Sequence, residues 1–107
     1  MTPSTFPASL AALADETRWN ILVFLGERPA SASALARRFP ISRQAINKHL
    51  AVLTEAGLVE STVVGRERVY APIGARLSEL GRYLTDVVQA WDRRLAALKA
   101  LAESVEE

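Results

Sequence analysis

The stretch Ser42–Leu53 reads SRQAINKHLAVL and decides the fold. Ser42 can accept a hydrogen bond from a free backbone amide at the start of a helix, and Gly57 follows at the position where helices commonly end. Between them, apolar side chains recur at the spacing of one helix face: Ala45, Ile46, Leu50 and Leu53. The stretch therefore predicts a capped amphipathic helix with one face in a core.

A shorter helix precedes it. Either Ser31 or Ser33 can cap this helix, and Pro40 stops it because proline disfavours helix in the residue before it. Its apolar residues are Ala34, Leu35, Ala36 and Phe39. Two helices joined by a turn of two or three residues, the second strongly capped, predict a helix-turn-helix.

The outward face of the 42–53 helix carries no acidic side chain. In the major groove of DNA, Arg and Lys pair with guanine, while Asn and Gln pair with adenine. A face that is merely solvated would normally mix charges of both signs, so the pattern favours nucleic acid as the partner. The candidate contacts in this helix are Ser42, Arg43, Gln44, Asn47, Lys48 and His49.

After Gly57 the residues become β-formers on both sides of Gly65-Arg66, up to Pro72 and Gly74. Glycine as the first residue of a two-residue loop predicts a type II′ hairpin. Arg66 at its tip and Arg68 could address phosphates or a minor groove, with Glu67 on the opposite face. Arginine at a hairpin tip is also an ordinary solubilising residue, so the position next to a basic helix carries the prediction.

Two helices are expected before the helix-turn-helix. The first runs from Ala8 to about Ala14, with Leu10 and Leu13 on one face. Asp15 can cap the second, which Gly26 is placed to end before a loop at 27–29. Its apolar stripe consists of Trp19, Ile21, Leu22 and Leu25.

The last predicted helix, residues 77–104, is too apolar for a lone surface helix. Leu77, Leu84, Trp91, Leu98 and Val105 recur every seven residues, and Val88, Leu95 and Ala102 follow four residues on. Such a repeat buries a seam against a partner helix, and this one is longer than a small core can cover. We expect a two-fold dimer whose interface contains Leu10, Leu13, Leu84, Val88, Trp91, Leu95 and Leu98.

Together these elements predict a mostly α-helical chain with a small β-hairpin, in the order α-α-α-α-β-β-α. This order is that of a winged helix-turn-helix. We expect one domain over residues 1–107, with residues 1–7 as a flexible lead-in and residues 77–104 as a C-terminal dimerisation helix.

Composition agrees with one soluble domain, since 50% of the 107 residues are apolar and 23% are charged. Positive charge is concentrated in residues 37–76, which contain seven basic and three acidic side chains, within a chain of net charge +1. That asymmetry suggests a local surface for a polyanion. Without a basic, apolar leader or a long apolar run we expect a cytoplasmic protein that neither spans nor binds a membrane.

The chain resembles the ArsR family of bacterial winged-helix repressors. The resemblance rests on Ala12–Leu22 (ALADETRWNIL), on Ser42–Leu50 and on Val52–Val59 (VLTEAGLV), and it extends from about residue 8 to residue 103. It implies a homodimer that binds a palindromic operator near its own promoter and represses transcription.

The sequence departs from this family in two places. Asn47 stands where serine is common, so base preference does not carry over. Cys 0 and a single histidine, His49, leave neither of the family's metal-sensing ligand sets, so we expect no metal site. We also expect no cofactor and no enzymatic activity, because nothing suggests a catalytic cleft around His49.

Two questions stay open at this level. His49 could donate to a DNA phosphate, or it could be a half-buried side chain bonded to a backbone carbonyl of a neighbouring helix. The alternative function is a winged-helix interaction or assembly module without DNA affinity, which would have no need for an acid-free helix face. The operator, the target genes, the choice between repressor and activator, and any effector ligand are not encoded in recognisable motifs.

Overall fold

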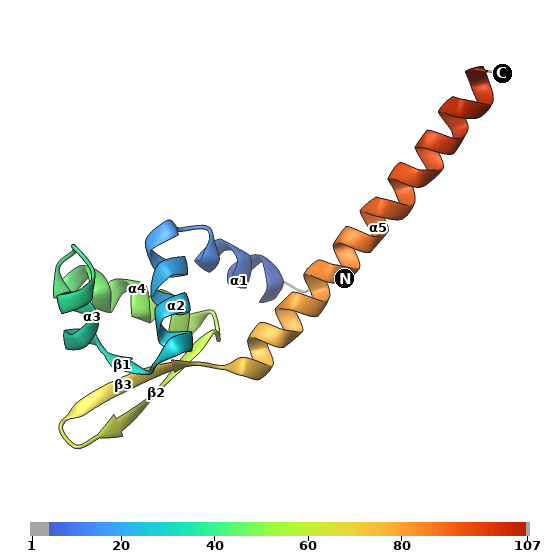
Figure 1. Cartoon of the computed structure of the whole chain (residues 1–107). Helices are drawn as coiled ribbons and strands as arrows, with labels where there is room; N and C mark the ends of the chain where they lie inside the picture. Colours follow the sequence, from blue (N-terminus) through green and yellow to red (C-terminus); the bar gives the residue numbers. More distant parts are fainter. Residues whose placement is uncertain (1–4, 107) are drawn as a thin grey trace. The chain divides into compact units, whose positions relative to one another are not determined.

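The computed structural model of the chain describes the backbone of residues 5–106 and the side chains of residues 8–105. It contains two compact units, one up to Leu77 and one from Ser78 onward. The first unit, which we call the winged unit, comprises α1 (Thr5–Leu13), α2 (Glu16–Glu27), β1 (Ala30–Ser31), α3 (Ala32–Arg38), α4 (Arg43–Glu55), β2 (Val59–Val64) and β3 (Glu67–Pro72) (Figure 1). Helix α5 (Gly74–Glu106) begins at its end and supplies the second unit.

Three helices begin at the caps that the sequence predicts. Asp15, Ser31 and Ser42 each accept a hydrogen bond from the backbone amide three residues further on, at 3.0–3.1 Å. Each cap satisfies one amide that has no partner inside its helix. Of the two serines proposed for α3, Ser31 is therefore the cap.

The sheet has three antiparallel strands in the order β1-β3-β2. The hairpin of β2 and β3 is confirmed: Val64 pairs with Glu67, and Gly65 has a φ of +64°. Because Arg66, between them, has no positive φ, the loop matches a type II′ turn. Strand β1 was not predicted, and Glu27 belongs to α2 rather than to the loop expected at 27–29.

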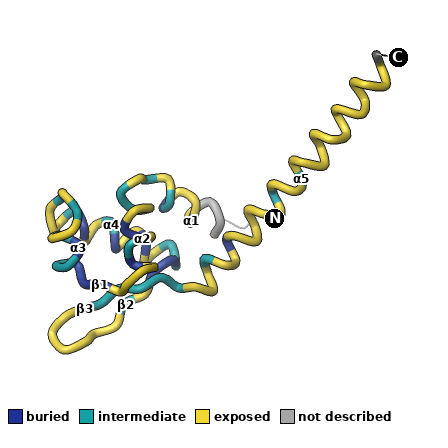
Figure 2. The backbone as a smooth tube through the Cα atoms, in the orientation of Figure 1, coloured by how far each residue is buried: buried dark blue, intermediate teal, exposed yellow. Residues whose placement is uncertain are grey.

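The core lies between α2, α3, α4 and the sheet (Figure 2). Its largest fully buried side chains are Ile21, Leu25, Leu35, Ile46, Leu50, Leu53, Leu58 and Val59. Ile46, Leu50 and Leu53 are thus buried as predicted, while Ala45 is half-buried at the edge of that face. These three side chains fix the rotation of α4 about its axis and so decide which residues point outward.

Two expectations for α2 are wrong. Trp19 is 50% exposed rather than buried with Ile21 and Leu25. Trp19 precedes Ile21 by two positions, which corresponds to 200° around a helix with 3.6 residues per turn, so the two side chains point to different sides. Gly26 does not end the helix, which continues to Glu27. Positive φ values occur among the described residues at Gly57 and Gly65, so Gly26 does not adopt the left-handed ending.

The outer helices differ from expectation in their bounds. Helix α1 starts at Thr5 rather than Ala8, so the expected lead-in of residues 1–7 is too long, and its first four residues lie outside the described part. Helix α5 starts at Gly74 rather than Leu77. The carbonyl of Ile73 accepts hydrogen bonds from the backbone amides of Arg76 and Leu77, which begins the helix earlier.

The winged unit thus has the predicted architecture with one strand added. Helices α3 and α4 form the helix-turn-helix, and β2 and β3 form the wing. This is a winged helix-turn-helix.

Candidate nucleic-acid interface

The outward face of α4 presents the predicted polar side chains to solvent. Arg43, Gln44, Asn47 and Lys48 are all exposed. Ser42 is exposed too, but its hydroxyl accepts from the amide of Ala45 and serves the helix start. Side chains of the types that pair with bases are therefore concentrated in the first turns of α4.

The wing lies beside this face. A groove of about 320 Å³ is lined on the α4 side by Arg43 and Asn47, and on the wing side by Arg66 and Arg68. Four residues predicted from separate stretches of sequence are therefore brought together. Gln44, Lys48 and His49 are not among the lining residues of this groove.

Five lining residues of this groove were not predicted as site residues: Ser31, Ala32, Ser33, Glu67 and Tyr70. Ser33 borders the groove from the start of α3, and Tyr70 borders it from β3. Tyr70 also lines a second hollow along α4, of about 560 Å³, together with Asn47 and Ser61. No local pattern marks Tyr70 as more than a strand residue, since its place depends on the register in which it pairs with Ser61 and Ala30.

The two wing arginines are held differently. The Nη1 of Arg68 donates to the Oγ of Ser61 at 3.0 Å, which ties it across the hairpin. Arg66 sits in the turn itself, between the paired residues Val64 and Glu67. Glu67, which was expected on the opposite face, also borders the groove with both arginines.

His49 is half-buried and faces α2. Its Nδ1 lies 3.5 Å from the Nη1 of Arg18. A guanidinium can only donate, so a hydrogen bond between these two groups requires Nδ1 to accept. Of the two alternatives left open for His49, its position is the half-buried one, but its neighbour in α2 is the Arg18 side chain rather than a backbone carbonyl.

Arg18 connects three parts of the winged unit. Its Nε donates to the carbonyl oxygen of Ala12 at 2.7 Å, and its Nη1 lies 3.9 Å from a carboxylate oxygen of Asp15. The backbone amide of Arg18 donates to Asp15 and is the largest cause of a lowered pKa at this carboxyl, with the Arg18 guanidinium adding to it. Arg18 therefore joins the α1–α2 junction to His49 on the recognition helix.

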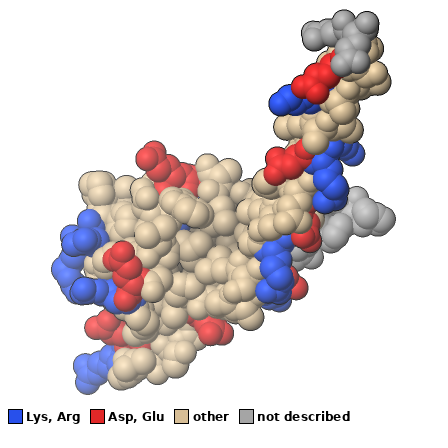
Figure 3. Space-filling model, turned by 45° about the vertical axis from the view of Figure 1, so that its right-hand side comes forward, with Lys and Arg blue, Asp and Glu red and all other residues tan. Residues whose placement is uncertain are grey.

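Charge on the surface follows the sequence pattern. Figure 3 shows Lys and Arg side chains gathered over the α3 end of the winged unit and at the tip of the wing. A basic surface beside exposed amide side chains provides phosphate attraction and base recognition together.

The residues predicted for the dimer interface differ in how far they are buried. Leu13 packs partly against the core, whereas Leu10 is exposed. In α5 the proposed seam is exposed throughout: Leu84, Val88, Trp91, Leu95 and Leu98. The guanidinium carbon of Arg94 lies 5.9 Å from the centre of a Trp91 ring.

Other kinds of site find no support in the described part of the chain. No three His, Cys, Asp or Glu side chains gather there as metal ligands would. None of its helices is long and apolar enough for a membrane span.

Comparisons with known proteins define the class and then the family. A model described as "Helix-turn-helix domain" matches residues 13–62. The HTH-type transcriptional regulator Rv2034 of Mycobacterium tuberculosis is 39% identical over 95 residues, which cover 87% of this chain and 84% of that protein. The solved ArsR-like transcriptional regulator from Rhodococcus sp. RHA1 has 52% identity and a TM-score of 0.82, covering 92% of this chain and 93% of that one.

A further solved structure shows the same fold at lower identity. The homodimeric winged helix-turn-helix DNA-binding domain Mb0332 from Mycobacterium bovis has 23% identity and a TM-score of 0.67, and covers 80% of both chains. The helix-turn-helix model, Rv2034 and the Rhodococcus regulator define the class as DNA-binding transcriptional regulators with a winged helix-turn-helix. The chain belongs to the ArsR-like family of these regulators.

Proposed function

We propose that the chain is a repressor that binds a palindromic operator as a homodimer. Helix α4 enters the major groove, and the wing contacts the adjacent backbone or minor groove. The observation that carries this proposal is the groove in which Arg43 and Asn47 of α4 face Arg66 and Arg68 of the wing. One surface thus combines cationic side chains that can contact phosphates with an amide side chain that can recognise a base.

The homodimer follows from the size of the reading surface. One recognition helix covers only a few base pairs, so two must lie about 34 Å apart to enter successive major grooves. The exposed seam of α5, from Leu84 to Leu98, is the apolar surface available for holding a second copy. The homodimeric state of Mb0332 is consistent with this arrangement.

The proposal extends to where and how the protein works. A regulator of this kind acts on chromosomal DNA, so we place it in the cytoplasm. Its action requires binding rather than catalysis and no metal or cofactor. The interaction-module alternative does not explain an acid-free α4 face next to a basic wing.

A gel-shift series on DNA from upstream of its own coding sequence tests the proposal. Neutralising about 6–10 phosphates predicts an affinity loss of about 10³–10⁵ between about 50 and 200 mM salt. Arg66→Gln should weaken binding and reduce the salt dependence. Arg82→Gln, at an exposed position in α5, is the matched control and should change neither. No binding, or binding indifferent to salt, contradicts the proposal.

A further inference from the structure

A second basic hollow lies away from the α4–wing groove. It measures about 300 Å³ and is lined by Phe24, Glu27, Arg28, Ala34, Arg37 and Arg38. None of these residues lines the groove between α4 and the wing. The DNA interface therefore leaves three arginines of the winged unit without a role.

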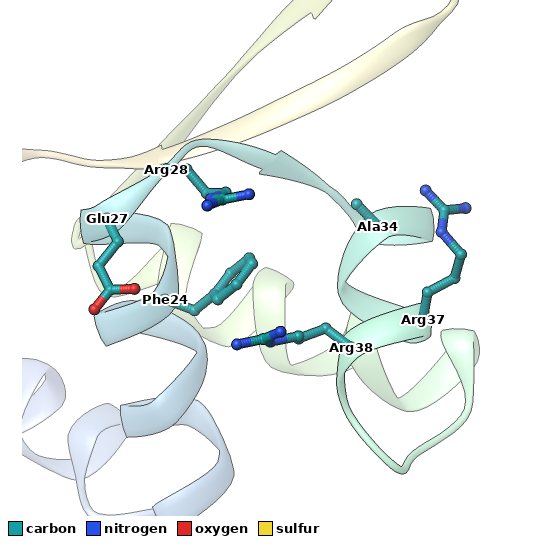
Figure 4. Close-up of a pocket in the computed structure, with 6 residues that line it drawn as sticks. All are labelled: Phe24, Glu27, Arg28, Ala34, Arg37 and Arg38. Carbon is teal, nitrogen blue, oxygen red and sulfur yellow. The ribbon is translucent and has the colours of Figure 1, made fainter.

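Two of the three arginines, Arg28 and Arg38, flank one aromatic ring, while Figure 4 shows Arg37 directed away from it. Figure 4 shows Arg28 reaching from the end of α2 towards α3, and Arg38 reaching back from α3 towards α2, with Phe24 between them. The guanidinium carbon of Arg38 lies 5.3 Å from the centre of the Phe24 ring. Phe39 packs edge-on against the same ring, with centroids 6.1 Å apart. These contacts hold the ring and the Arg38 side chain in place without using the hydrogen-bond donors of Arg38.

The donors of the hollow are free. Within the described residues, neither Arg28 nor Arg38 has a side-chain hydrogen bond or an ion pair. Glu27 borders the same hollow, but within the described residues its carboxylate forms no ion pair with these guanidinium groups. Two unpaired guanidinium groups beside an aromatic ring fit a carboxylate or phosphate group joined to a flat apolar body.

We propose that this hollow binds a small organic anion that carries a carboxylate or phosphate group on a planar apolar part. Its volume is at the lower end of the roughly 300–1,000 Å³ typical of ligand pockets and admits one ring. A DNA backbone is the less suitable occupant, because a phosphate ridge has no planar group to place against Phe24. The site is separate from the proposed operator surface and does not depend on DNA binding.

The test is an NMR titration of the full chain without DNA, following the Nε–H signals of the arginines. Benzoate and phenyl phosphate should move the signals of Arg28 and Arg38 saturably, whereas neutral benzamide should not. Inorganic phosphate should bind more weakly than phenyl phosphate because it lacks the ring. Equal binding of benzamide, or equal binding of the two phosphates, overturns the proposed chemistry.

Two variants locate the site. Arg38→Gln should weaken benzoate binding at least about tenfold, the effect of losing a charge-assisted contact. Arg94→Gln is the matched control, since Arg94 also stacks on an aromatic ring but does not line this hollow, and it should leave binding unchanged. Benzoate binding that both variants reduce alike contradicts the site. So does an Arg38→Gln variant that loses DNA affinity and salt dependence while benzoate moves no signal, because the hollow would then be a DNA phosphate contact.

Discussion

The winged unit and α5 bury their apolar side chains to opposite extents. In the winged unit, leucines and isoleucines from α2, α3 and α4 are fully buried, with Leu53 at 0% exposure. Between Gly81 and Val105 no side chain is buried, and Leu98 is 62% exposed. Apolar side chains at helical spacing are therefore buried by other residues of the chain in the winged unit, whereas those of α5 are left exposed.

This difference separates two kinds of apolar pattern. A stripe that matches neighbouring stripes along the same chain forms a core, and its helices can fold with the winged unit. A heptad repeat that continues for several turns beyond such neighbours requires another helix of similar length. We therefore expect the stability of the fold to depend on the winged unit and the proposed dimer to depend on α5.

The largest expected effect concerns the two tryptophans. Trp91→Ala should dissociate the proposed dimer and abolish operator binding, because truncating an aromatic ring that the dimer buries costs about 3–5 kcal/mol. Trp19→Ala is the matched control, since Trp19 has nearly the same exposure, 50% against 56%, but lies outside the proposed seam. Sedimentation and gel shifts on both variants check this. If both variants lost dimer formation and operator binding equally, the result would contradict the assignment of the dimer interface to α5.

A pair of leucines tests where stability resides. Leu53→Ala should lower the free energy of unfolding by about 2–5 kcal/mol at every protein concentration, because it leaves a cavity in the core. Leu98→Ala should instead act through dimer dissociation, so its effect should shrink as protein concentration rises. Urea unfolding at two protein concentrations distinguishes these outcomes. A concentration-independent loss for Leu98→Ala would place that side chain in a core of its own chain.

Base recognition should depend on the winged unit alone. Gln44→Ala or Asn47→Ala should each cost about 1–3 kcal/mol on the cognate operator and relax preference at particular bases. Arg66→Ala should weaken all sequences alike. Binding measured against a set of operator variants checks both statements, and equal, sequence-blind losses would show that α4 is not the reader.

The smallest effect concerns the titration of Asp15. Its carboxyl should titrate below the usual Asp pKa of about 3.9, chiefly because the Arg18 amide donates to it. A lowered folded pKa means that this contribution to stability is present above the unfolded pKa and is lost as pH falls through the folded one. Arg18→Ala keeps the amide and should restore the pKa only in part, which an NMR titration of the carboxyl carbon measures. Full restoration would make the guanidinium the main cause.

Much of the fold could be predicted because its signals are local. Asp15, Ser42 and the Gly65 turn act on residues a few positions away, so caps and hairpin follow from short stretches of sequence. Strand β1 could not be recognised, since its two residues pair with Val69 and Tyr70 about forty positions further on. Trp19 is exposed although it is apolar, because the helical period places it 200° around α2 from the buried Ile21.

The candidate site divides in the same way. Arg43 and Asn47 could be found from the period of α4, and Arg66 from the hairpin tip. Tyr70 and the hollow around Phe24 depend on how separate elements pack, so no spacing in the sequence reveals them. The contact between His49 and Arg18 joins residues 31 positions apart and is equally hidden.

Analytical ultracentrifugation of the wild-type chain at micromolar concentration tests the central claim most directly. The exposed seam of α5 predicts a species of twice the chain mass of 11.7 kDa. The same species should persist at salt concentrations that release DNA, because apolar burial rather than charge holds it together. A clean 11.7 kDa monomer would contradict the dimer and leave the apolar face of α5 without a partner.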